Sequence, residues 1–253
     1  QLTLNKNKFV TIEYNSTKNK KKLSVNIFKP LDWYSNQYRS GIILFHGGGF
    51  KIGSPERFYN QSLYFASKGY VVFVPEYRTQ SKDNTGPYEA TYDGHYFYNW
   101  LTKKSRQFGV DKNKLIVGGA SAGAQIAASI ANKNIFESQN SIKPLALILY
   151  NPAINISPKG KKTDQFFRDF FIDPAKECLN NFPPCIILHG TGDDIIPIDW
   201  ISDFVRKLED LGRDVVFKEF LNRGHGFFNI NKRDKDYKKC NEYIEFFLKK
   251  RGF

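Results

Sequence analysis

A serine flanked by small residues is the group in this sequence best suited to chemistry. Ser121 lies in the run Gly119-Ala120-Ser121-Ala122-Gly123, between a short apolar stretch and an Ala-rich segment. A tight turn from a buried strand into a helix brings chain segments close together, and small side chains avoid clashes there. Such a turn exposes the serine hydroxyl at a helix N-terminus, which predicts a nucleophile. Alone, the pattern would fit a simple packing turn equally well.

A second glycine-rich segment could supply the backbone N–H donors that a serine nucleophile needs to stabilise an oxyanion. His46-Gly47-Gly48-Gly49 follows the apolar run 41–45. When serine attacks an ester, the carbonyl oxygen becomes an oxyanion, and each backbone N–H aimed at it lowers the barrier by about 3 kcal/mol. We expect these donors to be Gly48, Gly49 and Ala122, with Gly47 as the alternative.

A base and an acid can be found further along the chain. His225 lies in Gly224-His225-Gly226-Phe227, after an apolar run and before the last predicted helix, where the base of a Ser–acid–His chain order belongs. The imidazole needs a carboxylate to fix its tautomer. Asp193 and Asp194 are both candidates, because they follow the apolar run 185–189.

The other histidines are expected to be structural. We interpret His46 as holding the glycine loop through hydrogen bonds, His189 as packing at the end of a buried strand, and His95 as structural or on the surface. None of the histidines is spaced from a cysteine or another histidine as metal ligands are. We therefore expect neither a metal site nor a cofactor.

The elements that would position these residues follow from apolar periodicity. Segments 9–14 and 23–28 alternate apolar and polar residues and predict an antiparallel hairpin, with its turn in Lys18–Lys22. Continuous apolar runs predict buried strands at 41–45, 71–75, 115–118, 145–150, 185–189 and 215–220. Helical patterns cover 57–68, 88–108, 122–132, 200–211 and 236–250. Strands alternating with helices predict an α/β fold, with a mainly parallel sheet and helices on both sides.

The length of 253 residues suits one domain spanning 1–253. Only 153–184 breaks the alternation, and it is expected to form a small lid or one wall of the pocket. The odd number of cysteines, three, argues against a disulfide framework, although Cys178 and Cys185 are close enough in sequence to form one bridge. The oligomeric state is expected to be a monomer or a small homo-oligomer.

The net charge of +13 allows two interpretations. One is attraction to a polyanion such as an acidic polysaccharide or nucleic acid. The other, which we favour, is a Lys- and Asn-rich solvated surface, because the charges are scattered and no nucleic-acid module is present. No apolar run approaches the ~20 residues that span a bilayer. The sequence shows no signal peptide and contains no Met, so it is expected to be a processed or trimmed form. If a signal was removed, the protein is expected to be secreted or periplasmic, and otherwise cytoplasmic.

The motifs together resemble the His-Gly-Gly-Gly branch of the α/β-hydrolases, which includes hormone-sensitive-lipase-like esterases. The chain is still more similar to small bacterial carbohydrate esterases of the acetyl-xylan and feruloyl type. The resemblance is carried by HGGGF at 46–50, GSPERFYNQSLYFASKGY at 53–70, PEYR at 75–78, GGASAGA at 118–124, HGTGDDIIP at 189–197 and GHGFF at 224–228. It implies an eight-stranded sheet and a two-step acyl transfer, and it favours Asp193 over Asp194 as the acid.

Departures from the family pattern narrow this expectation. Ala120 stands where hormone-sensitive-lipase-like members often have an acidic residue, and strand-like segments stand where they carry a helical cap. We therefore expect little or no cap and a Ser-His-Asp esterase that removes acetyl or feruloyl groups from carbohydrate. The alternatives are a general short-chain carboxylesterase acting on small esters and, disfavoured because every catalytic element has a candidate, a non-catalytic binding protein of this fold. The segment Glu76-Tyr77-Arg78 is interpreted as structural.

Overall fold

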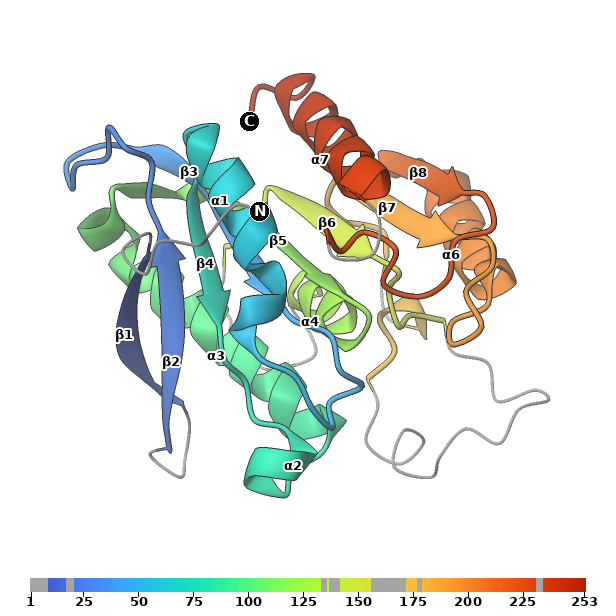
Figure 1. The fold of residues 1–253 in the computed structure, drawn as a ribbon, viewed down its shortest axis with the longest axis horizontal. Helices are drawn as coiled ribbons and strands as arrows, with labels where there is room; N and C mark the ends of the chain where they lie inside the picture. The colour runs from blue at the N-terminus through green and yellow to red at the C-terminus, as the bar shows by residue number, and fades with distance from the viewer. Residues whose placement is uncertain are drawn as a thin grey trace.

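The strands form a single eight-stranded sheet in the computed structural model, which describes residues 9–16, 21–132, 136, 142–155, 172–176, 179–230 and 234–253. Their spatial order is β1-β2-β4-β3-β5-β6-β7-β8 (Figure 1). The strands are β1 (Phe9–Ser16), β2 (Lys21–Phe28), β3 (Arg39–Phe45), β4 (Val71–Pro75), β5 (Val110–Ala120), β6 (Ala146–Tyr150), β7 (Cys185–Gly190) and β8 (Val215–Phe220).

The sheet is antiparallel only at one edge. β1 pairs with β2 from Phe9↔Phe28 to Ser16↔Lys21, and β2 is also antiparallel to β4. The neighbours from β4 through β3, β5, β6 and β7 to β8 are parallel. The expected hairpin and mostly parallel eight-stranded sheet are therefore confirmed. Of the expected turn, Lys21 and Lys22 lie in β2, whereas 17–20 are outside the described residues.

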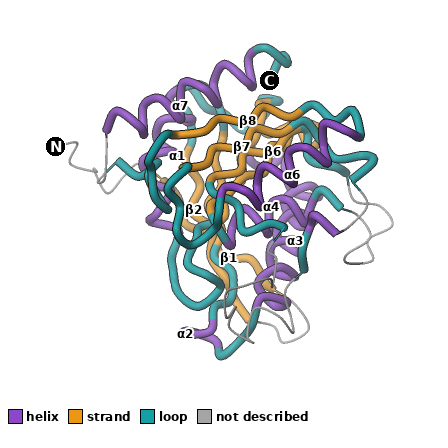
Figure 2. Tube along the Cα trace, turned by 90° about the vertical axis from the view of Figure 1, so that its right-hand side faces the viewer, coloured by secondary structure: helices purple, strands orange, loops and turns teal. Residues whose placement is uncertain are grey.

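Helices cover both faces of the sheet. Figure 2 shows α1 and α7 on one side of the strands and α3, α4 and α6 on the other. The α-helices are α1 (Tyr59–Ser67), α2 (Gln80–Asp83), α3 (Pro87–Lys104), α4 (Ala122–Ile130), α6 (Ile198–Asp210) and α7 (Asp234–Lys249). Short 3-10 helices are η1 (Pro55–Phe58), η2 (Ser105–Phe108) and η3 (Pro174–Lys176).

Side chains that alternate along each strand divide the core in two. In β3, Ile43 and Phe45 belong to the cluster that includes α3, α4 and α6, whereas Ile42 and Leu44 belong to the cluster on the side of α1 and α7. All four are completely buried, and each such side chain contributes about 1.5–3 kcal/mol of hydrophobic free energy. A strand buried on both faces explains why the sequence here is continuously apolar.

The bounds of all five predicted helices differ from the structure by a few residues, and two of these helices include a 3-10 turn. The helix expected at 57–68 begins as the 3-10 turn η1, with Pro55 at its start, where a missing N–H removes no helical hydrogen bond. The helix expected at 88–108 tightens into η2 and ends where Gly109 takes a φ of 65°, which side chains disfavour. The four-residue helix α2 was not predicted, because a short polar segment carries no periodicity.

The lid predicted at 153–184 falls largely on 156–171 and 177–178, which lie outside the described residues. Cys178 also lies outside them, while Cys185 and Cys240 are free and buried. In the part of the chain that the structure describes, no helix has the length and apolar character of a membrane span.

Candidate active site

Ser121 occupies the turn between β5 and α4 in a strained conformation. Its φ of 53° and ψ of −116° are unfavourable for a residue with a side chain. The turn is held on both sides, because the Ser121 N–H donates to the carbonyl of Tyr150 at 3.0 Å and its carbonyl accepts from Ala153 at 3.1 Å. These hydrogen bonds hold the half-buried serine in a strained backbone conformation, and such strain is common at functional sites.

Glycine is obligatory on either side of this serine. A Cβ on Gly123 would lie 2.0 Å from the Phe45 carbonyl oxygen, and one on Gly119 would lie 2.4 Å from the backbone of Gly123. The two sites bring the serine turn against the carboxyl end of β3. The small-residue pattern predicted from the sequence therefore has a direct steric cause.

The glycine loop, Gly47-Gly48-Gly49, lies against the same turn. A Cβ on Gly47 would lie 3.0 Å from the Ala120 carbonyl oxygen and 3.5 Å from Cβ of Ser121. Gly48 has a φ of 137°, and its carbonyl accepts hydrogen bonds from the N–H groups of Lys51 and Ile52 at 3.1 Å. The loop therefore curls back on itself directly beside the serine.

The predicted oxyanion donors line one cavity. Gly48, Gly49 and Ala122 border the same hollow as Ser121, and so does the alternative, Gly47. Ala122 opens α4, and the first N–H groups of a helix have no partner within it. The backbone around Ser121 is thus suited to an anion.

His46 supports the glycine loop from beneath. Its Nδ1 lies 2.9 Å from the Gly47 carbonyl oxygen, and its ring stacks on Tyr77 at 4.2 Å between centroids. The Tyr77 hydroxyl donates to the His46 carbonyl at 2.8 Å. Burial lowers the pKa of His46 to about 4, so the ring is neutral near pH 7. These contacts agree with the structural role inferred from the sequence.

His225 and Asp193 form a short pair. Nδ1 of His225 lies 2.7 Å from Oδ2 of Asp193, and Oδ1 of Asp193 accepts from the N–H groups of Ile195 and Ile196 at 2.9 Å each. Burial alone would raise the pKa of the Asp193 carboxyl, but the hydrogen bonds from His225 and Ile196 outweigh it and lower the pKa. Asp194, the other carboxylate considered, is exposed.

The loops after β7 and β8 are tied together, which fixes this pair. Gly190 and Phe220 face one another at the ends of the two strands. Beyond them the Gly192 N–H donates to the Arg223 carbonyl at 3.0 Å, and the Asn222 N–H donates to Oγ1 of Thr191 at 2.8 Å. The acid and the base therefore sit on one continuous hydrogen-bonded edge.

The remaining histidines do not line the cavity, although Nε2 of His189 lies 3.6 Å from Oδ2 of Asp193. His189 is fully buried, with Nε2 2.9 Å from the Ile196 carbonyl oxygen, and burial lowers its pKa. His95 lies on α3 with Nε2 3.0 Å from Oγ of Ser129, and burial lowers its pKa to about 3. Both have the packing roles expected of them.

The cavity has a volume of about 350 Å³ and brings Ser121 and His225 together with the glycine loop. Asp193 contacts His225 but does not line the cavity. The border of the cavity is mostly apolar or backbone and comprises Gly47, Gly48, Gly49, Arg57, Phe58, Ala120, Ser121, Ala122, Asn151, Ala153, Ile195, Ile196, His225, Gly226, Phe228 and Asn229. A site of this size suits a small ester.

Two polar residues of this border were missed by sequence reasoning. Asn151 follows β6 with a φ of 32°, is almost completely buried, and places Nδ2 3.0 Å from Nε2 of His225. Arg57 lies in η1 at the cavity rim. The only available signal for Asn151 was a polar residue just beyond an apolar strand, at the sheet edge where ligands bind in parallel α/β folds.

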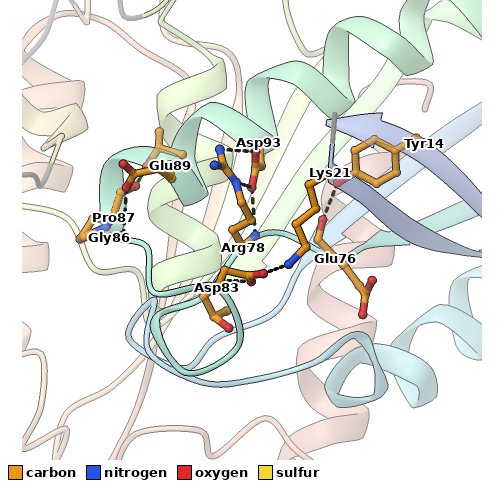
Figure 3. Close-up of polar contacts among 11 residues, drawn as sticks. Tyr14, Lys21, Glu76, Arg78, Asp83, Gly86, Pro87, Glu89 and Asp93 are labelled. Atoms are coloured by element: carbon orange, nitrogen blue, oxygen red, sulfur yellow. Dashed lines mark hydrogen bonds and ion pairs between the residues drawn. The ribbon is translucent and has the colours of Figure 1, made fainter. Parts of the chain in front are cut away.

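The Glu76-Tyr77-Arg78 segment is structural, as interpreted. Figure 3 shows Arg78 facing Asp93 of α3, with Nε and one terminal nitrogen bonded to the two carboxylate oxygens at 2.8 and 2.9 Å. Tyr14 of β1 donates to the Glu76 carbonyl in the same view. Tyr77, the middle residue of this segment, donates to the His46 carbonyl and stacks on its ring. The segment therefore also supports the glycine loop.

Within the described ranges, no three His, Cys, Asp or Glu side chains gather as metal ligands would. A serine, an imidazole whose Nδ1 faces a carboxylate, and a glycine loop can together perform acyl transfer.

The chain is similar to known hydrolases. A family model described as alpha/beta hydrolase fold matches residues 42–175. Esterase LipC of Mycobacterium tuberculosis is 22% identical over 156 residues, which are 51% of this chain but only 38% of LipC. A thermophilic esterase of the Planctomycetes species Thermogutta terrifontis, Est2 with propionate bound, superposes with a TM-score of 0.87 at 29% identity, covering 98% of this chain and 96% of that one. The same esterase phosphorylated by paraoxon gives a TM-score of 0.86 at 29% identity, covering 98% of this chain and 95% of that one.

Proposed function

This chain belongs to the α/β-hydrolase fold family, and from that membership we propose that it is a serine carboxylic ester hydrolase. Ser121 is the nucleophile, His225 the general base and Asp193 the acid that orients it. The observation that carries the proposal is the 2.7 Å contact between His225 and Asp193 at a cavity that His225 shares with Ser121. The likeness to Est2, an esterase, over nearly the whole chain supports the same class.

The reaction proceeds through an acyl-enzyme. Oγ of Ser121 attacks the ester carbonyl carbon while Nε2 of His225 takes the hydroxyl proton. The N–H groups of Gly48, Gly49 and Ala122 stabilise the resulting oxyanion. The bond to the alcohol oxygen then breaks, and the alcohol leaves with the proton from His225. Water, deprotonated by His225, attacks the acyl-enzyme and releases the acid and the free serine.

The pairing of His225 with Asp193 decides which ring nitrogen reacts. An imidazole whose Nδ1–H is donated to a carboxylate has its acceptor lone pair on Nε2. Asp193 also stabilises the imidazolium that forms when Nε2 takes the proton. Its second oxygen is held by two backbone N–H groups, so the carboxylate cannot rotate freely away from His225.

Two substrate classes are compatible with the site. The first is carbohydrate bearing acetyl or feruloyl groups, in keeping with the motif resemblance. The second is small short-chain esters, which the cavity of about 350 Å³ favours. Est2 has been solved with propionate and with butyrate, which also supports a short acyl group here. The two classes share the catalytic residues and differ in the alcohol.

Hydrolysis of p-nitrophenyl acetate and labelling by paraoxon test the catalytic assignment. We expect the wild type to hydrolyse the ester and to gain one diethylphosphoryl group on Ser121, detected by peptide mass spectrometry. Ser121→Ala should do neither, while its circular dichroism spectrum stays that of the wild type. Equal hydrolysis by the two proteins, or labelling at another serine, would refute the nucleophile.

The alcohol is tested by incubating the enzyme with acetylated xylan, with feruloylated oligosaccharides and with ethyl acetate. Release of acetate or ferulate is followed by mass spectrometry. Turnover of the sugar esters supports the carbohydrate assignment. Turnover of ethyl acetate alone supports the short-chain carboxylesterase.

A further inference from the structure

Arg57 places a positive charge on the rim of the cavity that holds Ser121 and His225. No aspartate or glutamate of the described residues lines this cavity, and its other residues are apolar, small or neutral amides apart from His225. Among the described residues that line the cavity, Arg57 is therefore the one Lys, Arg, Asp or Glu side chain. Catalysis of a neutral ester does not require it.

The Arg57 side chain is not committed to a neighbouring carboxylate. It is exposed, and among the described residues it has neither an ion pair nor a side-chain hydrogen bond. The adjacent Glu56 is directed elsewhere, since Oε1 accepts from the Tyr59 hydroxyl at 3.4 Å and the carboxyl also bonds Ser54. A guanidinium without a protein partner can accept an anion from a ligand.

The backbone that carries Arg57 is fixed in place. The Arg57 N–H donates to the Ser54 carbonyl at 3.3 Å. Phe58, the next residue, is 1% exposed and packs against Tyr150 and Phe228 at ring-centroid distances of 5.8 and 6.2 Å. These contacts anchor the start of the Arg57 side chain at the cavity rim.

The charge of Arg57 acts toward the reacting centre. Burial is the main reason why the pKa of His46 is low, and the positive charge of Arg57 lowers it further. His46 lies directly under the glycine loop through its contact with Gly47. The field of Arg57 therefore extends to the loop where a substrate carbonyl would bind.

We propose that Arg57 binds a carboxylate carried by the substrate, so that the enzyme favours acidic esters over neutral ones. This rests on the proposed function, because it concerns the substrate of the same site. Arginine presents a planar fork of donors that matches a carboxylate in two parallel hydrogen bonds. The net charge of +13 adds long-range attraction for such a substrate.

Matched ester pairs test the proposal on both sides of the scissile bond. On the alcohol side, para-acetoxybenzoate is compared with its neutral methyl ester. On the acyl side, mono-p-nitrophenyl glutarate is compared with its methyl-capped neutral form. We expect kcat/KM of the wild type at low salt to favour the acidic member of at least one pair by about fivefold, as a solvent-exposed charged pair allows. The preferred pair shows where the carboxylate sits.

Variants separate the local contact from the overall charge. Arg57→Gln should bring the ratio of acidic to neutral kcat/KM close to one, whereas Arg57→Lys should retain part of it. Arg106→Gln removes the same charge in η2, at the opposite end of β5 from Ser121, and should retain the full preference. A wild-type ratio of one in both pairs, or a preference that survives Arg57→Gln, would overturn the proposal. Absence of any ester hydrolysis, p-nitrophenyl acetate included, would instead overturn the proposed function.

Discussion

The side-chain amide of Asn151 lies 3.0 Å from Nε2 of His225, the ring nitrogen that takes the proton from Ser121 in the proposed mechanism. The same amide nitrogen is 3.3 Å from Nδ1, so it approaches both nitrogens from one side of the ring. Asn151 is fixed by its own N–H, which donates to the Leu188 carbonyl at 2.8 Å. The base is thus held by Asp193 at one position and by Asn151 at another.

Asn151→Ala should lower kcat/KM for p-nitrophenyl acetate about fivefold, because loss of one hydrogen bond worth roughly 1 kcal/mol leaves the ring less well oriented. Asn84→Ala is the matched control, since Asn84 also has a positive φ, 52°, but does not line the cavity. A faster Asn151→Ala enzyme would mean that the amide competes with Ser121 for Nε2.

Asp193→Asn should lower kcat by about 10⁴, because an amide no longer selects the imidazole tautomer with its acceptor on Nε2. Asp194→Asn, one residue along and exposed, should stay within a factor of about three of the wild type. Steady-state hydrolysis of p-nitrophenyl acetate measures both. If only the Asp194 variant lost activity, the acid would be misassigned.

Gly123→Ala should abolish most activity, because its Cβ would lie 2.0 Å from the Phe45 carbonyl oxygen. The strand end that leads into the glycine loop must then shift, and a displacement near 1 Å costs about a hundredfold in rate. Gly192→Ala is the control, since its nearest contact would be an ordinary 3.5 Å. Activity is measured alongside thermal melting; an active, normally stable Gly123→Ala protein would contradict the packing.

The free energy of unfolding should fall as pH decreases from about 6.5 toward 4. Burial lowers the folded-state pKa of His46 to about 4 and that of His95 to about 3, against an ordinary value of 6.5. Above pH 6.5 both states carry neutral rings, so these groups add no pH dependence. Below it, the unfolded chain binds protons that the folded chain does not, which destabilises the fold by up to about 3 kcal/mol for His46.

Urea unfolding between pH 7.5 and 4 measures this dependence, over a range set by the ordinary histidine pKa of about 6.5. His95→Gln should show a shallower fall than the wild type, because one proton-linked group has been removed. The same slope in both proteins would show that His95 is not buried as a neutral ring.

Much of the fold could be predicted because a buried strand appears in the sequence as a continuous run of apolar residues. β4 and β8 have the bounds that their apolar runs predict, 71–75 and 215–220. The other strands differ from their predicted bounds by one or two residues, except β5, which differs most: it begins at Val110, although residues 112–114 are exposed and polar. Its extension comes from Val110 pairing with Arg39 of β3, a tertiary contact that periodicity does not contain.

Part of the candidate site could also be predicted, because several of its residues lie in short local motifs. Ser121, Asp193 and His225 lie in short motifs whose glycines and turns are visible in the sequence, and the structure brings all three to one edge of the sheet. Asn151 looks like an ordinary turn residue, and Arg57 looks like a surface charge on a helix. Both gain a role only from neighbours distant in sequence, Asn151 from His225 and Arg57 from the cavity around Ser121.

The pairing of β7 with β8 has a consequence for how the chain is made. Ser121 and the glycine loop lie on the earlier strands, whereas His225 follows β8, which must dock beside β7 before the base can reach Asp193. Strand pairs formed across long sequence separations are slow to assemble. A chain emerging from the ribosome therefore carries its serine and its anion-binding loop well before its base. In the proposed mechanism the chain is therefore inactive until β8 has docked beside β7, so the onset of esterase activity would report the last step of folding.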